Sequence, residues 1–233
     1  MNNISKTLYN KTITFIILWG LILEFPIRFF TSPDPWIHNA DHWYFLQPNR
    51  LLIEIGFVFL AFLPFLMVKE LKPLLSIKWT KKNVLFLALG IIIPVIIFTS
   101  QQWEEVGDIR SNNLLQYVPI WFATGMVIGI GQELTFRGLI FTGFNQKYGL
   151  KWAVIISTLC FVFGTIHSPR MYAYFINGYI YEALLLLFIF ILTGLFFAWL
   201  RVRTKNIIIP ALAHGIGNAI TWFTYVIVKL YVN

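Results

Sequence analysis

Four polar side chains lie in three long apolar stretches of the sequence, and their types suit a hydrolytic or metal-binding site. Glu133 lies in one stretch, His167 ends a second, and His214 and Asn218 lie in a third. A carboxylate and two imidazoles can take up and release protons, and an amide can donate a hydrogen bond to a developing negative charge. Two histidines and one glutamate are also a ligand set that zinc accepts. The residue types therefore predict either water activation or metal binding.

Each of these residues, taken alone, has a simpler structural explanation. Glu133 and Arg137 are four residues apart, so they share a helix face and could form an internal ion pair. His167 could be a hydrogen-bonded residue near a helix end. His214 and Asn218, also four apart, could clamp two helices together by hydrogen bonds. The functional interpretation depends on all of them meeting in one place.

Helix rise allows the four residues to meet at one level of a membrane. Counted from the nearest basic loop, Glu133 lies about 21 Å along its helix, His167 about 24 Å, and His214 and Asn218 about 14 and 20 Å. Small residues would also let two of these helices approach closely: Gly125, Gly129, Ala211 and Gly215. We therefore expect Glu133, His167, His214 and Asn218 to line one water-accessible polar cavity.

The composition predicts that membrane-spanning helices position these side chains. Of the 233 residues, 58% are apolar and 12% are charged, which excludes a soluble enzyme, a disordered chain and a disulfide-stabilised secreted domain. Seven apolar runs are long enough to cross a bilayer, at 12–30, 51–68, 84–100, 118–142, 151–168, 180–200 and 206–230. The predicted fold is all-α, a polytopic bundle of seven to eight spans, with a further short helix at 111–117 as the eighth element. Residues 1–233 form one integral membrane domain in this prediction.

The first run is the least regular, because Glu24, Pro26 and Arg28 interrupt it. No small-residue cleavage site follows it, so we expect an uncleaved helix rather than a signal peptide. Glu24 and Arg28 are expected to form an interfacial ion pair. His38 and His42 are four residues apart, and we expect them to lie in a solvated interfacial loop rather than to bind a metal.

The charges alternate between loops in the way that sets membrane orientation. Basic residues gather before the first span and after the second, fourth and sixth spans: Lys6, Lys11, Lys69, Lys72, Lys78, Lys81, Lys82, Lys147, Lys151, Arg201, Arg203 and Lys205. This pattern predicts seven spans with the N-terminus in the cytoplasm and the C-terminus outside. The net charge of +8 is then explained by orientation and contact with membrane lipids. No nucleic-acid partner is expected.

The three polar segments resemble the motifs of the CPBP family, the intramembrane proteases related to type II CAAX prenyl endopeptidases and bacteriocin-processing or immunity proteins. Glu133 and Arg137 match the second glutamate and the arginine of its first motif, and Phe163 with His167 match its second. His214 with Asn218 match its third motif, so the motif-bearing core covers about 118–220. The resemblance implies a protease of the bacterial plasma membrane that hydrolyses a peptide or a lipidated protein.

One residue departs from the family pattern, because Gln132 stands where the family has its first glutamate. The resemblance implies that position 132 and His167 activate water, and that His214 and Asn218 stabilise the oxyanion. It also implies that Glu133 orients these catalytic groups, with Arg137 and Phe163 in supporting roles. A glutamine cannot accept the proton, and loss of a general base typically costs about 10²–10⁴-fold in rate. The chain is therefore either an inactivated form of a protease or a natural member without catalysis.

Two questions stay open from the sequence. A metal-free mechanism is favoured, with zinc held by Glu133, His167 and His214 as the alternative. The second functional hypothesis is a catalytically silent immunity or scaffold protein in the membrane, which Gln132 supports. A transporter is a weaker hypothesis, because the sequence lacks the paired broken helices of internal repeats.

Overall fold

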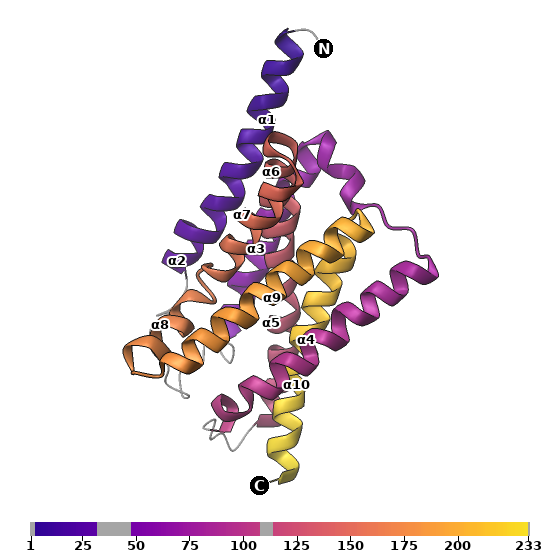
Figure 1. The fold of residues 1–233 in the computed structure, drawn as a ribbon. Coiled ribbons are helices and arrows are strands. Elements are labelled where there is room, and N and C mark those ends of the chain that lie inside the picture. The colour runs from indigo at the N-terminus through magenta and orange to yellow at the C-terminus, as the bar shows by residue number, and fades with distance from the viewer. Residues whose placement is uncertain (1–2, 32–47, 108–113, 233) are drawn as a thin grey trace.

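The computed structural model describes residues 3–31, 48–107 and 114–232, and every regular element in these ranges is a helix (Figure 1). Four of the described helices are long and apolar enough to cross a membrane, at Tyr9–Thr31, Asn49–Met67, Lys81–Thr99 and Ile180–Thr204. Two shorter apolar helices lie at Leu150–Val162 and Ile208–Thr221. The predicted all-α membrane bundle is confirmed.

The N-terminal half begins with a helix that changes its winding near its end. Its elements are α1 (Asn3–Ile22), the π-helix η1 (Leu23–Ile27), α2 (Arg28–Thr31), α3 (Pro48–Met67), the 3₁₀ helix η4 (Lys69–Leu75) and α4 (Lys81–Gly107). Pro26 lies inside η1. Because proline has no backbone N–H, it removes one α-helical hydrogen bond, which is consistent with the local π-helical winding.

The C-terminal half carries the three motifs. Its elements are α5 (Leu114–Glu133), the π-helix η5 (Leu134–Ile140), α6 (Phe141–Tyr148), α7 (Leu150–Val162), α8 (Ser168–Ile176), α9 (Ile180–Thr204) and α10 (Ile208–Val232). Gly149 and Gly178 end two of the turns between helices with φ of 86° and 83°, conformations that glycine adopts without a steric penalty.

The predicted fifth span, 151–168, is wrong at its C-terminal end. The helix α7 ends at Val162, and a turn over residues 163–167 leads into α8. Apolar residues continue through this turn, so hydropathy gives no sign that the helix stops. The rise calculation for His167 assumed a continuous helix and does not apply.

The eighth element, expected at 111–117, is not a separate helix among the described residues, because Leu114 already begins α5. Residues 108–113 lie outside the described part of the chain.

The helices that carry the first and third motifs pack in backbone contact. A Cβ atom added to Gly129 of α5 would lie 2.6 Å from the backbone nitrogen of Gly215 on α10. No side chain fits at such a distance, so both positions need glycine. Helix α10 also packs along α4, and both helices contact α9 (Figure 1). The predicted close approach of these two helices is confirmed at Gly129 and Gly215.

Large apolar side chains cover much of the outer surface. Leu52 is 68% exposed, Ile96 64% and Leu184 60%, and they belong to three different candidate spans. In water such a surface would be costly, whereas hydrocarbon accepts it without penalty. The outer surface is therefore consistent with the lipid environment that the composition predicts.

Candidate active site

Glu133 lies at the junction of α5 and the π-helix η5, and its carboxylate joins two of the three motifs. Its Oε1 accepts a hydrogen bond from Arg137 Nη1 at 3.1 Å and contacts His214 Nδ1 at 2.9 Å. Glu133 and Arg137 have no exposed surface, and His214 is 5% exposed. π-Helical turns inside helices are frequent at functional sites. The structure thus brings together two segments that are 81 residues apart in the chain.

The partners of His214 determine which of its ring nitrogens carries a proton. A carboxylate oxygen only accepts, so Nδ1 must donate to Glu133. The imidazole stacks on Phe197 of α9, with ring centroids 4.5 Å apart and planes 13° apart. This stacking and the hydrogen bond to Glu133 hold the ring in one orientation, with Nε2 on the side away from Glu133.

Arg137 binds the same oxygen of the Glu133 carboxylate as His214 does. Its Nη2 donates to the backbone oxygen of Gly194 at 2.8 Å, and its guanidinium lies 4.7 Å from the ring centroid of Phe161. These contacts satisfy a buried charge with a carboxylate, a carbonyl and an aromatic face, as a charge in a low-dielectric interior requires. Arg137 therefore supports Glu133, as the motif implies.

His167 lies in the turn after α7, directly before α8. Its Nδ1 lies 2.6 Å from the backbone oxygen of Phe161, and its ring packs on Phe161 and Phe190 with centroid distances of 4.3 and 4.4 Å. The ring of Phe161 also lies 5.9 Å from that of His214. Both motif histidines therefore contact the same aromatic side chain.

Phe161 is a site residue that the motif analysis missed. It is 1% exposed and contacts Arg137, His167 and His214. Phe163, the aromatic residue of the second motif, is instead 53% exposed on the outer surface. No spacing rule separates these two phenylalanines, because both lie in the same apolar run. The supporting role assigned to Phe163 is thus not reflected in a contact with this cluster.

Three buried polar atoms of the cluster have no hydrogen-bond partner within the described part of the chain. They are Nε2 of Gln132, Oε2 of Glu133 and Nε of Arg137, on residues that are 2%, 0% and 0% exposed. A buried polar group without a partner costs several kcal/mol in hydrocarbon. The Gln132 and Glu133 atoms, on adjacent residues, therefore call for a polar partner such as water or substrate. Asn218 lies one turn beyond His214 on α10 and is half-buried.

The side chains as placed do not form a zinc site. Within residues 3–31, 48–107 and 114–232, no three side chains of histidine, cysteine, aspartate or glutamate gather closely enough to hold a metal ion. Glu133 Oε1 is engaged by Arg137 and His214. His214 turns its Nδ1 toward that carboxylate, so the predicted alternative set of Glu133, His167 and His214 does not fit the ion.

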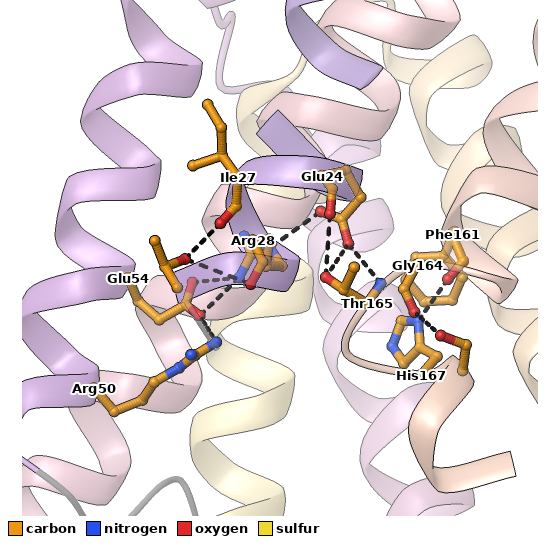
Figure 2. A network of polar contacts seen from close by, with 11 residues as sticks. Glu24, Ile27, Arg28, Arg50, Glu54, Phe161, Gly164, Thr165 and His167 are labelled. Atoms are coloured by element: carbon orange, nitrogen blue, oxygen red, sulfur yellow. Dashed lines mark hydrogen bonds and ion pairs between the residues drawn. The ribbon is translucent and has the colours of Figure 1, made fainter. Parts of the chain in front are cut away.

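A second buried polar cluster lies beside the turn that holds His167, and it contains the predicted ion pair of Glu24 and Arg28. Glu24 and Arg28 are each 1% exposed and join Arg50 and Glu54 of α3 in one network (Figure 2). The signal for this network was the presence of two further ionisable residues, Arg50 and Glu54, at the start of an apolar run. The predicted loop with His38 and His42 lies outside the described residues.

Comparisons with known proteins agree with the motif assignment. Residues 114–220 match the family model of "Type II CAAX prenyl endopeptidase Rce1-like" proteins. A curated relative in Bacillus subtilis (strain 168), "Putative membrane peptidase YdiL", is 28% identical over 107 residues. That match covers 46% of this chain and 37% of the relative, so the chain matches little more than a third of the relative's length. No solved structure matches.

Proposed function

We propose that the chain is an intramembrane endopeptidase, because residues 114–220 match the family model of the Rce1-like type II CAAX prenyl endopeptidases and its three motifs resemble those of the CPBP proteases. Its substrate in this proposal is a membrane-associated or lipidated peptide. The observation that carries the proposal is the hydrogen bond between Glu133 and His214, next to the unpartnered Gln132 Nε2 and Glu133 Oε2.

The proposed reaction is attack of water on the scissile carbonyl. His167 donates its Nδ1–H to the oxygen of Phe161, so in the neutral ring Nε2 carries the lone pair that can take the proton from water. The carbonyl oxygen becomes an oxyanion, the C–N bond then breaks, and the proton passes to the leaving nitrogen. The products are a carboxylate and an amine.

Glu133 and His214 serve the oxyanion in this scheme. The Glu133 carboxylate orients the His214 ring through Nδ1, and when the ring is doubly protonated its Nε2–H can donate to the oxyanion. Asn218, one helical turn away, can supply a second donor from its amide. Such preorganised donors often contribute most to the rate of acyl transfer, because a low dielectric strengthens each contact.

Gln132 limits the rate of this reaction in the proposal. Its amide can hold a water molecule but cannot take its proton. Gln132→Glu should therefore raise the rate by about 10²–10⁴-fold, and His167→Ala in that background should abolish the gain. The assay is cleavage of quenched fluorogenic CAAX-type peptides, with and without a farnesyl group, by the full chain in lipid nanodiscs. Gln146→Glu, the same change on the partly exposed face of α6, is the matched control and should leave the rate unchanged.

The presence of Gln132 also favours a second candidate, a catalytically silent immunity or scaffold protein. It predicts that Gln132→Glu gains no activity even against a peptide that a related enzyme cleaves in parallel. Efficient cleavage with Gln132 in place would contradict both the proposal that Gln132 limits the rate and the proposal of a silent protein. The general base would then have to be another group.

We also propose that the N-terminus lies in the cytoplasm of a bacterial cell, on the basis of the alternating loop charges. Lys78 and Asn177 are both exposed in loops between helices and should lie on opposite sides of the membrane. In a Cys160→Ser background, an impermeant maleimide added to intact cells should label Asn177→Cys and spare Lys78→Cys. Labelling of both from outside would contradict the orientation.

A further inference from the structure

Four charged side chains form a continuous buried row beside the candidate active site. Arg28 Nη1 donates to both carboxylate oxygens of Glu54 at 2.7 and 2.8 Å, and its Nε donates to Glu24 Oε2 at 3.1 Å. Arg50 donates to the same Glu54 from one turn earlier on α3. All four residues are at most 1% exposed. Two positive and two negative charges balance, which a buried group of this size requires.

The row of charges ends on the turn that carries His167 (Figure 2). Glu24 Oε1 accepts a hydrogen bond from the backbone N–H of Thr165 at 3.2 Å. The hydroxyl of Thr165 donates to the backbone oxygen of Glu24 at 3.1 Å. One residue of the π-helix η1 thus binds both the backbone and the side chain of a residue 141 positions away.

The neighbouring Gly164 shows how closely the carboxylate approaches this turn. A Cβ atom at Gly164 would lie 2.8 Å from Glu24 Oε1, which is too near for a carbon and an oxygen that do not share a bond. The backbone oxygen of Gly164 then accepts from the N–H groups of His167 and Ser168, both at 3.0 Å. Thr165, which binds Glu24, therefore lies two residues before His167. The adjacent Gly164 is joined to His167 by one backbone hydrogen bond.

The orientation of the His167 ring depends on this turn. Its Nδ1 reaches back to the oxygen of Phe161, so the chain between 161 and 167 must keep its path for that bond to form. That bond selects the tautomer in which Nε2 can accept a proton from water. A loosened turn would release both the position and the tautomer of the ring.

We propose that Glu24 is a positioning residue for His167, acting through Thr165, and that η1, α2 and α3 thereby complete an active site whose motifs lie in residues 114–220. The inference rests on the proposed function for the role of His167 in catalysis. It also assigns the buried charges of η1, α2 and α3 a role beyond stability: the row fixes the Glu24 carboxylate, and the carboxylate fixes the turn.

A first experiment reads the His167 ring directly and needs no substrate. The full chain, labelled with ¹⁵N-histidine in detergent micelles, should show His167 as the Nδ1–H tautomer, with the signal assigned by its loss in His167→Ala. In Glu24→Ala, this signal should move toward a mixture of tautomers. Glu182→Ala, which removes an exposed carboxylate from the first turn of α9, should leave it in place. Unchanged His167 shifts in Glu24→Ala would overturn the inference.

A second experiment measures the consequence for catalysis in the Gln132→Glu background. Glu24→Ala should lower kcat on the order of 10²-fold, with little change in KM, because misplacement of a reacting group by about 1 Å costs that much. Thr165→Val should act in the same direction, and Thr165→Ser, which keeps the hydroxyl, should restore the rate. If kcat in all three variants changes only in proportion to the fraction of protein that is folded, the positioning role of Glu24 is contradicted.

The two experiments separate this inference from the proposed function. If Gln132→Glu shows no activity but the His167 tautomer still depends on Glu24, the proposed function fails and the positioning contact stands. If Glu24→Ala does not fold, Thr165→Val tests the same contact without removing a buried charge. Normal His167 shifts in a folded Thr165→Val variant would then refute the inference.

Discussion

Two Glu–Arg pairs of identical spacing, Glu24–Arg28 and Glu133–Arg137, lie in different parts of the chain, and each adjoins a π-helical turn. In the first pair both carboxylate oxygens have partners, Oε2 with Arg28 and Oε1 with Thr165. In the second, Oε1 is shared by Arg137 and His214, and Oε2 has no partner within the described residues. The same sequence pattern thus yields one carboxylate with a partner on each oxygen and one carboxylate with an oxygen that lacks a partner.

The difference shows that spacing alone does not identify a functional pair. A carboxylate with a partner on each oxygen, such as that of Glu24, is committed to holding those partners in place. A carboxylate with a spare oxygen, next to a glutamine amide that also lacks a partner, has room for a reacting molecule. Four predictions test this distinction.

The largest expected effect is on stability and comes from the network of Glu24, Arg28, Arg50 and Glu54. Glu54 lies between Arg28 and Arg50, so Glu54→Ala removes the carboxylate that both guanidinium groups share. Breaking a buried ion pair from one side typically costs about 3–5 kcal/mol. Thermal unfolding in micelles, followed by a maleimide dye that reacts with Cys160, measures the loss. Glu70→Ala, on the exposed side of η4, is the control, and an equal shift in both variants would show that the network does not stabilise the fold.

The second prediction concerns the Glu133–Arg137 pair and should appear in activity. Glu133→Gln keeps the shape but removes the carboxylate that orients the His214 ring and fixes Nδ1 as its donor. In the Gln132→Glu background we expect kcat/KM to fall by about 10–100-fold, the typical effect of losing a group that orients a catalytic histidine. The free energy of unfolding should change less than in Glu54→Ala. If Glu133→Gln lowers the free energy of unfolding as much as Glu54→Ala but keeps kcat/KM per folded molecule, Glu133 is a structural residue and not part of the catalytic machinery.

The third prediction tests the helix contact that brings Glu133 and His214 together. Gly129→Ala would place a methyl group 2.6 Å from the backbone of Gly215, so α5 and α10 must separate. Overpacking of this kind typically costs about 1–3 kcal/mol. Gly56→Ala, where a Cβ atom would meet nothing within 4 Å, is the matched control. The same unfolding assay should show a lower midpoint for Gly129→Ala alone, and equal midpoints would mean that the helices tolerate the extra distance.

The parts of the molecule that could be predicted from the sequence are those governed by the bilayer and by helix periodicity. Long apolar runs predicted the helices, and the small residues Gly129 and Gly215 predicted the close contact of α5 and α10. The four-residue spacing of Glu133 and Arg137 predicted their pairing. The motif order placed His214 near Glu133, which the hydrogen bond between them now shows.

The parts that could not be predicted depend on contacts between distant segments or on where an apolar helix stops. Helix α7 ends at Val162, but the apolar residues Phe163 and Ile166 follow it, so hydropathy extended the predicted span to residue 168. Phe161 could not be distinguished from Phe163 without knowing that end. The contact of Glu24 with Thr165 spans 141 residues, and neither residue belongs to a motif. Periodicity describes one helix at a time and contains no information on such pairs.

The smallest expected effect concerns the start of α10, the helix that carries His214. Asn206 Oδ1 accepts a hydrogen bond from the backbone N–H of Ile209 at 3.0 Å, which satisfies one of the free N–H groups at the helix start. Asn206→Ala should lower the free energy of unfolding by about 1 kcal/mol, and Asn206→Asp, which keeps the accepting oxygen, should lower it less. Because His214 lies two turns further along, the bond to Glu133 should survive, so the ¹⁵N signal of His214 should not move. A displaced His214 signal in Asn206→Ala would show that the candidate site depends on the end of its helix as well as on its packing against α5.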